Sequence, residues 1–368
     1  MIPFLDLKKI NAPFEQEFKN KFDSFLEKGW YVLGEEVQLF EAEYAQYCGT
    51  RHCVGTANGL DALRLIFEGC KILEQLQEGD EVLVASNTYI ATIIAIKQAD
   101  LIPVLVEASL LTYNFDFEDL ERKITPNTKV ILPTHLYGKL TDMERINAFA
   151  KAYNLLVITD CAQSHGAKDI NGNRSGSLAD ASAHSFYPTK NLGALGDAGA
   201  ITTDNEALAQ VVKKYRNYGF KERYVAEYAG VNSRLDEIQA AFLRIKLKQL
   251  DIQNRRRREI AMKYLSKIHN EHMILPQLNK EENHVWHLFV IRSVYRDQLQ
   301  THLQNKGIGT NIHYPVPPHK QEALSEYNMQ SFSVCEQLYK EVLSIPLSPA
   351  LSDVDVEDII TALNSFRC

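Results

Sequence analysis

Residues 81–108, EVLVASNTYIATIIAIKQADLIPVLVEA, contain two runs of aliphatic residues separated by an amphipathic stretch. The pattern predicts a strand at 81–86, a helix at 88–99 and a second strand at 101–108. A strand, a helix and a strand in this order form a right-handed crossover between parallel strands. This unit therefore indicates an α/β fold built on a parallel sheet.

The same alternation continues on both sides of this unit, from about Arg51 to Thr203. Further strands are predicted at 52–57, 130–137, 155–160, 181–186 and 199–203, and further helices at 58–73 and 142–153. We therefore expect a mostly parallel mixed sheet flanked by helices. Because ligands bind at the carboxyl ends of strands in such sheets, the residues that follow each strand are the candidates for chemistry.

The pattern changes after Ser233, where residues 234–269 read as one long helix. Beyond it, strands are predicted at 284–293 and around Ile308–Tyr314, and helices near Arg296–Asn305, Ser331–Leu343 and Asp353–Phe366. We therefore predict a large α/β domain over residues 1–249 and a smaller α+β domain over residues 250–368. The first residues, up to about residue 15, are expected to be able to pack with the smaller domain.

The composition limits the classes of function. The chain has 368 residues, and at about 150 residues per domain this length favours two domains. Hydrophobic residues make up 45% and charged residues 24%, which is the balance of a globular protein. The 47 acidic residues exceed the 40 basic ones, and the net charge of −7 repels polyanions. We therefore expect neither nucleic acid nor a membrane as a partner.

The cysteines and histidines form no metal-binding motif. The six cysteines contain no CxxC pair, and the eleven histidines contain no HxxxH or HExxH motif, so no metal is predicted. The N-terminal residues lack a secretory pattern, and no apolar run approaches the ~18 residues that span a bilayer. We therefore expect a cytoplasmic protein with reduced thiols.

Three features that follow predicted strands carry possible chemistry. Asn58 and Gly59 open a helix, whose free N–H groups can bind an anion, although many such turns bind nothing. Asp160 ends an apolar strand and requires a cation or several donors, or else acts as an N-cap. Lys190 lies on a turn bounded by proline and glycine, where desolvation can make its amine a nucleophile. Taken alone, such a lysine is usually a solvated charge.

The combination of these features is more informative than any one of them. The sequence supplies three distinct groups: a helix start that can bind an anion, a carboxylate at a strand end, and a lysine on a turn. Ser185 lies five residues before this lysine. Pyridoxal 5'-phosphate needs a phosphate cradle, a partner for its cationic ring nitrogen and an amine that bonds to its aldehyde. The residues therefore predict a pyridoxal-phosphate site.

Ordered motifs along nearly the whole chain resemble the DegT/DnrJ/EryC1/StrS sugar aminotransferases. The motifs are FLDL (4–7), GTANGLDAL (55–63), NTYIAT (87–92), ITDCAQSHGA (158–167), SFYPTKNLG (185–193), GDAGAITT (196–203), RNYG (216–219), GVNSRLDEIQAA (230–241), IHYPVPPHKQ (312–321) and IPLSP (345–349). This resemblance implies fold type I of the pyridoxal-phosphate enzymes. Within the family, the opening residues 2–14 and the stretch GWYVLGEEV (29–37) are most similar to nucleotide-sugar 3-ketohexose aminotransferases.

The resemblance assigns roles to four residues around the cofactor ring. Lys190 matches the lysine that bonds covalently to the cofactor, and Asp160 matches the carboxylate that faces the pyridine nitrogen. Gln163 matches the residue beside the ring oxygen, and Tyr89 matches an aromatic residue stacked on the ring. Lys190 and Asp160 are thus the expected catalytic residues.

The phosphate contacts also follow from the resemblance. Asn58, Gly59 and Ser185 match contacts within one subunit, and Asn232 matches an asparagine that reaches the phosphate from the partner subunit of a homodimer. Leu60 is a departure, because many relatives have a threonine there. Without the hydroxyl of that threonine, the backbone N–H groups are expected to supply more of the hydrogen bonds to the phosphate.

The resemblance further implies a reaction in two halves. L-Glutamate gives its amine to the cofactor, leaving pyridoxamine phosphate, and a nucleotide-linked keto sugar then accepts the amine. The expected substrate is a dTDP-linked 3-keto-6-deoxyhexose, and the expected product is a 3-amino-3,6-dideoxyhexose for surface glycans such as O-antigen lipopolysaccharide. Tyr187, Lys221, His313, Tyr314 and His319 are candidate sugar-nucleotide contacts, with solvation or packing as the alternative for each.

Three other functions remain as alternatives. Transamination at C4 of the sugar differs from C3 only in how the hexose is rotated. A sugar dehydratase of this family replaces the cofactor lysine by histidine, so Lys190 argues against it. A regulatory protein that binds the cofactor is disfavoured because the lysine, aspartate and glutamine set is complete.

Other conspicuous residues have structural explanations. Arg255–Arg258 lie within the long predicted helix, so their side chains should point to different faces. His135, His165, Trp30 and Trp286 are expected to be structural or packing residues.

Overall fold

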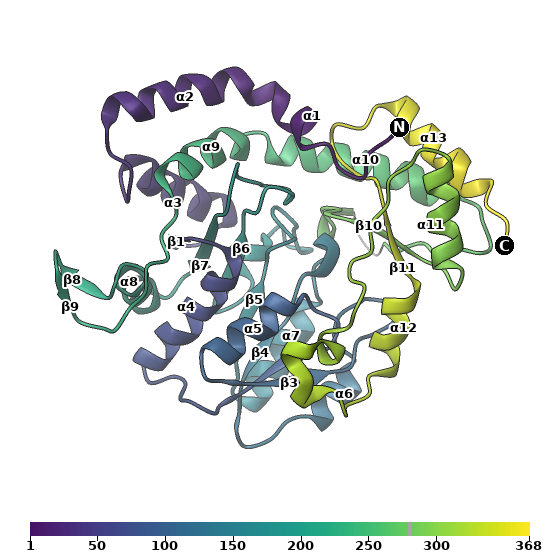
Figure 1. Cartoon of the computed structure of the whole chain (residues 1–368). Coiled ribbons are helices and arrows are strands. Elements are labelled where there is room, and N and C mark those ends of the chain that lie inside the picture. The colour runs from purple at the N-terminus through teal and green to yellow at the C-terminus, as the bar shows by residue number, and fades with distance from the viewer. Residues whose placement is uncertain (279–280) are drawn as a thin grey trace.

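The computed structural model describes residues 1–278 and 281–368, and its centre is a seven-stranded sheet (Figure 1). The sheet order is β1-β7-β6-β5-β4-β2-β3, and β7 alone among these strands runs against its neighbours. The seven strands are β1 His52–Thr56, β2 Glu81–Ala85, β3 Ile102–Val106, β4 Thr128–Leu132, β5 Leu156–Asp160, β6 Ala181–Ser185 and β7 Gly199–Thr203. The predicted mostly parallel mixed sheet is confirmed.

Helices surround the sheet and continue into the C-terminal region. They are α1 Leu7–Asn11, α2 Glu15–Lys28, α3 Glu35–Cys48, α4 Gly59–Ile72, α5 Ile90–Gln98, α6 Phe117–Arg122, α7 Met143–Tyr153, α8 Glu206–Tyr215, α9 Glu237–Leu247, α10 Leu250–Lys267, α11 Arg296–Asn305, α12 Ser333–Glu341 and α13 Asp353–Asn364. Two smaller sheets pair β8 Phe220–Glu222 with β9 Val225–Ala226, and β10 Phe289–Arg292 with β11 Val342–Ile345.

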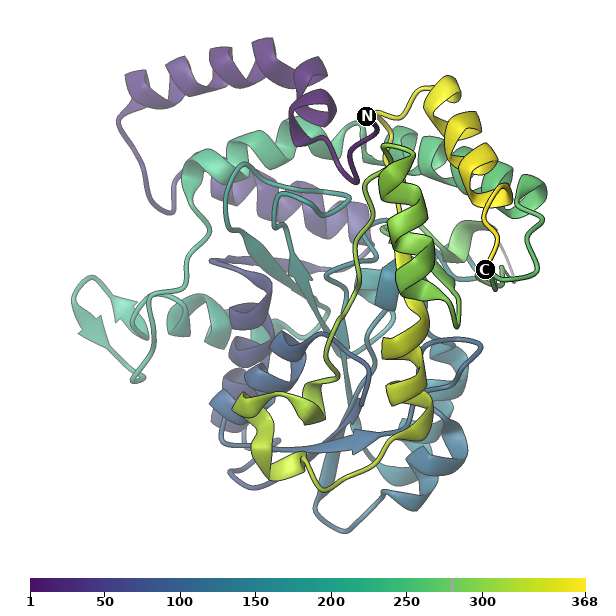
Figure 2. The same ribbon diagram turned by 45° about the vertical axis from the view of Figure 1, so that its right-hand side comes forward.

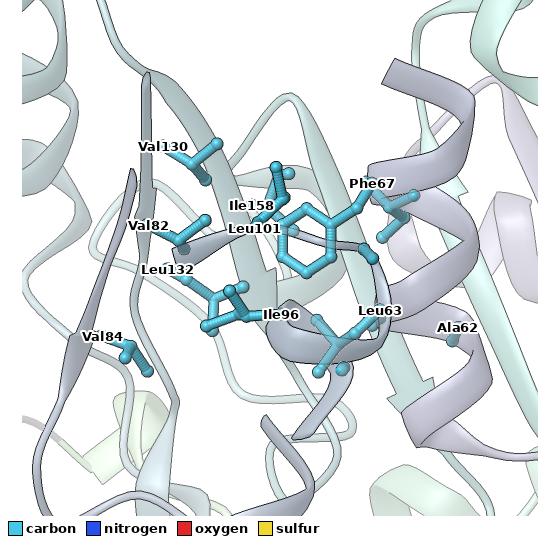
Figure 3. Close-up of a cluster of buried hydrophobic side chains, with 14 of the residues drawn as sticks. Ala62, Leu63, Phe67, Val82, Val84, Ile96, Leu101, Val130, Leu132 and Ile158 are labelled. Carbon is cyan, nitrogen blue, oxygen red and sulfur yellow. The ribbon is translucent and has the colours of Figure 1, made fainter. Parts of the chain in front are cut away.

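Successive side chains of each strand point to opposite faces of the sheet, and each face packs against a different layer of helices. On one face, Val82 and Val84 of β2 pack with Leu63 and Phe67 of α4 and Ile96 of α5 (Figure 3). On the other face, a separate cluster joins the sheet to α6 and α7. The intervening residue of β2, Leu83, belongs to this second cluster. Burial on both faces explains the nearly continuous apolar character of these strands.

The C-terminal region has its own core around α10, α11, α13, β10 and β11. Ile2 packs on this core and forms a bridge to Ile308, so the N-terminal residues lie beside the C-terminal region, as Figure 2 also shows. Leu324 and Phe332, in contrast, pack on the central sheet cluster. The division at residue 250 remains a prediction, and contacts cross it in both directions.

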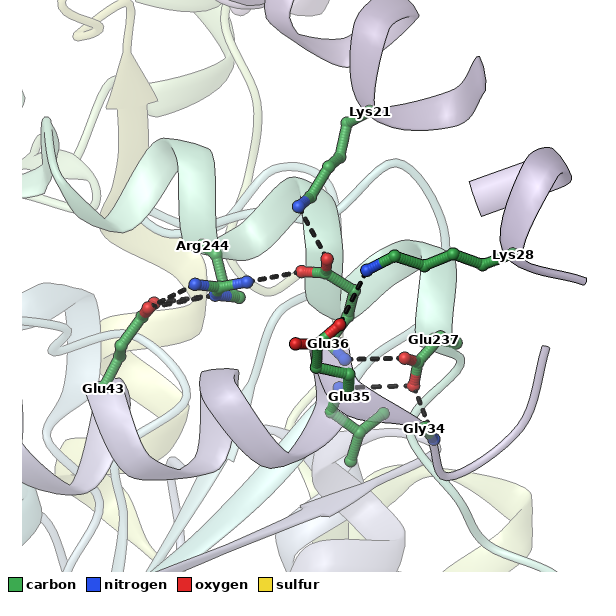
Figure 4. Close-up of polar contacts among 9 residues, drawn as sticks. Lys21, Lys28, Gly34, Glu35, Glu36, Glu43, Glu237 and Arg244 are labelled. Atoms are coloured by element: carbon green, nitrogen blue, oxygen red, sulfur yellow. Dashed lines mark hydrogen bonds and ion pairs between the residues drawn. The ribbon is translucent and has the colours of Figure 1, made fainter. Parts of the chain in front are cut away.

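Charged residues join the N-terminal helices to α9 (Figure 4). The carboxylate of Glu237 accepts hydrogen bonds from the backbone N–H groups of Gly34, Glu36 and Val37, which begin α3. A negative group at a helix N-terminus accepts hydrogen bonds from the free N–H groups and is attracted to the positive end of the helix dipole. Arg244, also on α9, pairs with the Glu36 carboxylate at 2.6 Å. These contacts fix α9, which carries a buried lysine toward the site described below.

Several predicted elements in the C-terminal part are wrong in extent. Residues 308–314 form isolated bridges at Ile308 and Asn311 rather than a strand. The single helix predicted at 234–269 is two helices, α9 and α10, separated at Lys248 and Gln249. The helix predicted at 331–343 ends at Glu341, because β11 begins at the next residue and pairs with β10.

Two predicted strands are shorter than expected for identifiable reasons. The strand predicted at 130–137 ends at Leu132, because Pro133 has no N–H for the ladder. The strand predicted at 284–293 is confined to Phe289–Arg292, where β11 is available as a partner.

The tryptophans differ from one another. Trp286 is buried, as predicted, whereas Trp30 is 65% exposed on the loop after α2, so its predicted packing role within this chain is wrong. Of the four arginines at 255–258, Arg257 is buried and Arg255 is exposed, which confirms the different faces. Within the described ranges, no helix has the length and apolar character needed to cross a membrane.

Candidate active site

Lys190 lies on a turn that follows β6 and returns toward β7. Its backbone N–H donates to the Tyr187 carbonyl at 2.8 Å, and the N–H of Ala194 donates to the Phe186 carbonyl at 2.8 Å. In the described parts of the chain, Nζ of Lys190 makes no hydrogen bond or ion pair. Burial lowers the pKa of this amine to about 8, and the negative charge of Asp160 partly opposes the shift. A large fraction of the amine is therefore neutral, and so nucleophilic, near pH 8.

Asp160 ends β5 and is buried. Its Oδ2 accepts from the Thr92 hydroxyl at 2.8 Å, and its Oδ1 accepts from the Ala162 N–H at 3.0 Å. Desolvation raises the pKa of the carboxyl, while these two donors and Lys190 act in the opposite direction. A buried carboxylate with remaining lone pairs favours a cationic N–H donor as a further partner.

The start of α4 and the end of β6 meet closely. Asn58 caps α4, as predicted, because its Oδ1 accepts from the Asp61 N–H at 2.8 Å. A Cβ on Gly59 would lie 2.6 Å from Cβ of Ser185, so only glycine permits this approach. Asn58, Gly59 and Ser185 are thus brought together. Leu60, the departure from the family pattern, packs against the core cluster of the sheet.

Gln163 joins two tyrosines beside Asp160. Its Oε1 accepts from the Tyr137 N–H at 2.6 Å, and its Nε2 donates to the Tyr314 hydroxyl at 3.1 Å. The Tyr137 hydroxyl in turn donates to the His313 carbonyl at 2.6 Å. The ring of Tyr89 lies 4.9 Å from that of Tyr314 and is tilted by 35°. These contacts place Gln163, Tyr89, His313 and Tyr314 in one neighbourhood.

The remaining sugar-nucleotide candidates, and Asn232, which was expected to bind the phosphate, are dispersed. Tyr187 is exposed, three residues before Lys190. His319 is fully buried, with its Nε2 3.1 Å from a Glu336 carboxylate oxygen, which favours the packing interpretation. Lys221 and Asn232 are exposed beside the β8–β9 hairpin, which projects from the body of the molecule (Figure 1). The chain by itself does not bring these two residues to Lys190.

Sequence reasoning missed several polar residues around the site. Thr92 is the donor to Asp160, and Thr88 links it to Thr134 through hydroxyl contacts of 3.0 and 2.9 Å. Thr88 and Thr92 lie in the motif NTYIAT, so the family resemblance could have identified them as residues near the site. Asn191 and His287 contact each other at 3.2 Å, and only the fold shows that these two residues are neighbours.

The residues present fit pyridoxal phosphate. The helix start at Gly59, pressed against Ser185, offers backbone donors to a phosphate, and Asp160 offers a carboxylate to a ring N–H. Lys190 offers an amine with a lowered pKa. A mostly parallel sheet with helices on both faces, together with this amine, carboxylate and helix start, defines a pyridoxal-phosphate-dependent enzyme of fold type I. Pyridoxal phosphate is its cofactor.

The family model for the DegT/DnrJ/EryC1/StrS aminotransferase family matches residues 13–364, and the chain belongs to this family. The chain is 52% identical to a dTDP-3-amino-3,6-dideoxy-alpha-D-galactopyranose transaminase from Aneurinibacillus thermoaerophilus, over 100% of this chain and 99% of that protein. The chain is therefore a nucleotide-sugar aminotransferase.

Solved structures support the fold and the cofactor. Streptomyces venezuelae DesV in complex with a ketimine intermediate has a TM-score of 0.94 and 40% identity, covering 99% of this chain and 97% of that one. The Bacillus subtilis protein NtdA with bound cofactor PMP has a TM-score of 0.91 and 30% identity, covering 98% of this chain and 84% of that one. The predicted fold class is confirmed by both.

Proposed function

We propose that this enzyme transfers the amino group of L-glutamate to C3 of a dTDP-linked 3-keto-6-deoxyhexose, giving a dTDP-3-amino-3,6-dideoxyhexose. The 52% identity over the whole chain to a transaminase named for such an aminosugar is the observation that carries this proposal. A product of this kind suits the assembly of surface glycans such as O-antigen lipopolysaccharide, and we propose that the reaction takes place in the cytoplasm.

We propose catalytic roles for Lys190 and Asp160. When bound, pyridoxal phosphate supplies an aldehyde carbon that bonds to amines and a ring that withdraws electrons. The carboxylate of Asp160 would hold a proton on the ring nitrogen through a charge-assisted hydrogen bond. Nζ of Lys190, once displaced by the amino donor, would move a proton between the substrate carbon and the cofactor carbon.

Other residues would hold and orient the reactants. The N–H groups at the start of α4, with Asn58 and Ser185, would bind the phosphate. Gln163 would donate its second amide hydrogen to the ring oxygen, because one is already used on Tyr314. Tyr89 would cover the ring, and His313, Tyr314 and Tyr187 would contact the hexose.

We further propose a homodimer whose two active sites are shared. Lys221 and Asn232 are exposed on or beside a projecting hairpin, from which a second subunit could receive a diphosphate contact and a phosphate contact. Exposed apolar residues along α2 and the loop that follows it supply a surface that a partner would cover, namely Phe22, Leu26, Trp30, Tyr31 and Val32. Such a dimer interface would also explain why Trp30 is exposed in the single chain.

The test is to incubate the enzyme with L-glutamate and either a 3-keto or a 4-keto dTDP-6-deoxyhexose, and to identify the product by NMR. Amination at C3 of the 3-keto sugar is expected. Amination at C4 would replace the proposal by the 4-keto alternative, since the two differ only in the rotation of the hexose. Absence of any conversion of the cofactor to its amine form with glutamate would reject L-glutamate as the donor.

A further inference from the structure

The turn that carries Lys190 is also held by a side chain of its own that contacts segments outside the turn. Asn191, the next residue, is 4% exposed and makes three side-chain contacts. Its Nδ2 donates to Oδ1 of Asn254 at 2.8 Å and to the Val285 carbonyl at 3.0 Å, and its Oδ1 lies 3.2 Å from Nδ1 of His287. The partners come from α10 and from the segment that leads into β10.

Two backbone carbonyls fix the direction of these hydrogen bonds. The Val285 carbonyl accepts only, so the nitrogen of the Asn191 amide must face it. Both hydrogens of that nitrogen are then used, and Oδ1 of Asn191 accepts from His287, whose Nδ1 must carry a hydrogen. Likewise, Nδ2 of Asn254 donates to the His165 carbonyl at 2.8 Å, which leaves its Oδ1 as the acceptor for Asn191.

The result is one directed chain of hydrogen bonds from His287 through Asn191 and Asn254 to the His165 carbonyl. It begins in the segment before β10, passes the residue next to Lys190, crosses α10 and ends in the loop that starts at Asp160. Asn254 is 1% exposed and His287 is 8% exposed, so water does not compete for these bonds. This series of hydrogen bonds therefore joins the turn that carries Lys190 to the loop that follows Asp160.

We propose that Asn191 is a positioning residue for Lys190, and that Asn191, Asn254 and His287 act as one unit that fixes the lysine turn relative to the loop of Asp160. The inference rests on the proposed role of Lys190 in binding the cofactor. Because an amine must approach the aldehyde carbon along a narrow range of directions, a turn that is free to shift would react more slowly. Asn191 itself need not touch the cofactor.

The experiment compares Asn191→Ala, Asn254→Ala and the double variant, and measures how fast cofactor-free protein captures added pyridoxal phosphate at Lys190. Borohydride reduction followed by peptide mass analysis locates the bond. Each single variant is expected to slow capture at least tenfold. The double variant is expected to be no slower than the slower single variant, because either change breaks the same chain.

Asn114→Ala is the matched control. Asn114 is 6% exposed, and its Oδ1 accepts from the Thr141 hydroxyl at 2.9 Å. It takes no part in the series of hydrogen bonds that runs from His287 through Asn191 and Asn254. This variant should lower the melting temperature and leave the capture rate unchanged. Should Asn191→Ala not fold, Asn191→Asp keeps the size and the acceptor for His287 but loses both donors, and the same slow capture is expected.

Two outcomes would overturn the proposal. One is a capture rate within twofold of the unmodified protein in the Asn191 and Asn254 variants, whatever their melting temperatures. The other is a double variant whose defect equals the product of the two single defects, which would mean that the residues act independently. Failure of the unmodified protein to capture the cofactor at Lys190 is a separate result and would reject the proposed function itself.

Discussion

Gly59 at the start of α4 lies so close to Ser185 at the end of β6 that a Cβ on the glycine would fall 2.6 Å from Cβ of the serine. Two segments that are far apart in the sequence thereby form the proposed phosphate cradle. Replacing the glycine must shift one of them, because the obstructing atoms include the backbone of Ser185.

Gly59→Ala is therefore expected to weaken binding of pyridoxamine phosphate by tenfold or more, measured by equilibrium dialysis. Gly69→Ala is the control in the same helix, where the added Cβ would meet the end of the flexible Leu208 side chain. It should retain the affinity of the unmodified protein. Equal affinities in the two variants would show that the cradle does not hold the phosphate.

Lys190→Ala is expected to abolish both turnover and the absorption band of the lysine-bound cofactor, because no other amine would take its place. Its melting temperature without cofactor should stay close to that of the unmodified protein, since Nζ makes no hydrogen bond within the described residues. Lys151→Ala changes an exposed lysine and should have no effect. Normal activity of Lys190→Ala would refute the assignment.

The pH dependence of cofactor capture should report the amine of Lys190. Only the neutral amine reacts, so the rate should rise with pH up to a pKa of about 8 and become constant above it. The negative charge of Asp160 raises this pKa, so Asp160→Asn should move the profile to lower pH. Stopped-flow absorbance would measure both profiles. A shift to higher pH in the variant would contradict the proposed electrostatic relationship.

Lys246 on α9 is a buried cation whose Nζ donates to the carbonyl of Gly193, in the turn of Lys190, and to Oδ1 of Asn11 at 3.0 Å. Burial, with a smaller contribution from the charge of Arg257, lowers the pKa of this lysine from 10.5 to about 8. Between these two pH values the unfolded chain binds more protons than the folded one, so this group stabilises the fold increasingly as pH rises.

Lys246→Met removes this contribution. As pH rises from about 8 to 10.5, the free energy of unfolding of the unmodified protein should increase relative to that of Lys246→Met. The increase should be at most about 1.4 kcal/mol per pH unit. Urea unfolding at a series of pH values would measure it. The exposed neighbour Lys248 provides the control, and Lys248→Met should give a constant difference. A constant difference for Lys246→Met would contradict the lowered pKa.

The proposal that two subunits share each active site can be tested by subunit complementation. Lys190→Ala and Asn232→Ala are each expected to be impaired as homodimers. In a mixed dimer, one site would carry both defects and the other neither, so random mixing should restore about a quarter of the unmodified activity. Co-expression with two affinity tags would isolate the mixed dimer. Activity no higher than the sum of the separate variants would show that Asn232 serves its own subunit.

The local sequence was sufficient for the central sheet, and it also supplied the residues that we propose as the reacting groups. Strands such as Glu81–Ala85 were predictable because both faces are buried, which requires nearly continuous apolar residues. Asn58 was recognisable as a helix cap, since the chemistry of a cap is local. Lys190 and Asp160 could be proposed as neighbours because strand ends in such a sheet lie at one edge.

The errors occurred where a distant partner decides the structure. Residues 308–314 have a strand-like pattern, but among the described residues their backbone bridges to β11 only at Asn311, so they form no ladder. The packing alternative for His319 could not be chosen from its proline-rich surroundings, because the side chain is buried with its Nε2 3.1 Å from the distant Glu336 on α12. Trp30 was expected to be packed and is exposed in the single chain.

The sequence by itself determined the α/β architecture and the family, and it proposed the lysine and the carboxylate, because these depend on short patterns and on the order of motifs. Only the tertiary structure decided that Thr92 donates to Asp160, that Ser185 closes on Gly59, and that Asn191 is joined to His287. These pairs are separated by 68, 126 and 96 residues. No local pattern encodes such contacts, since the order of the strands in the open sheet and the packing of helices on it bring the segments together.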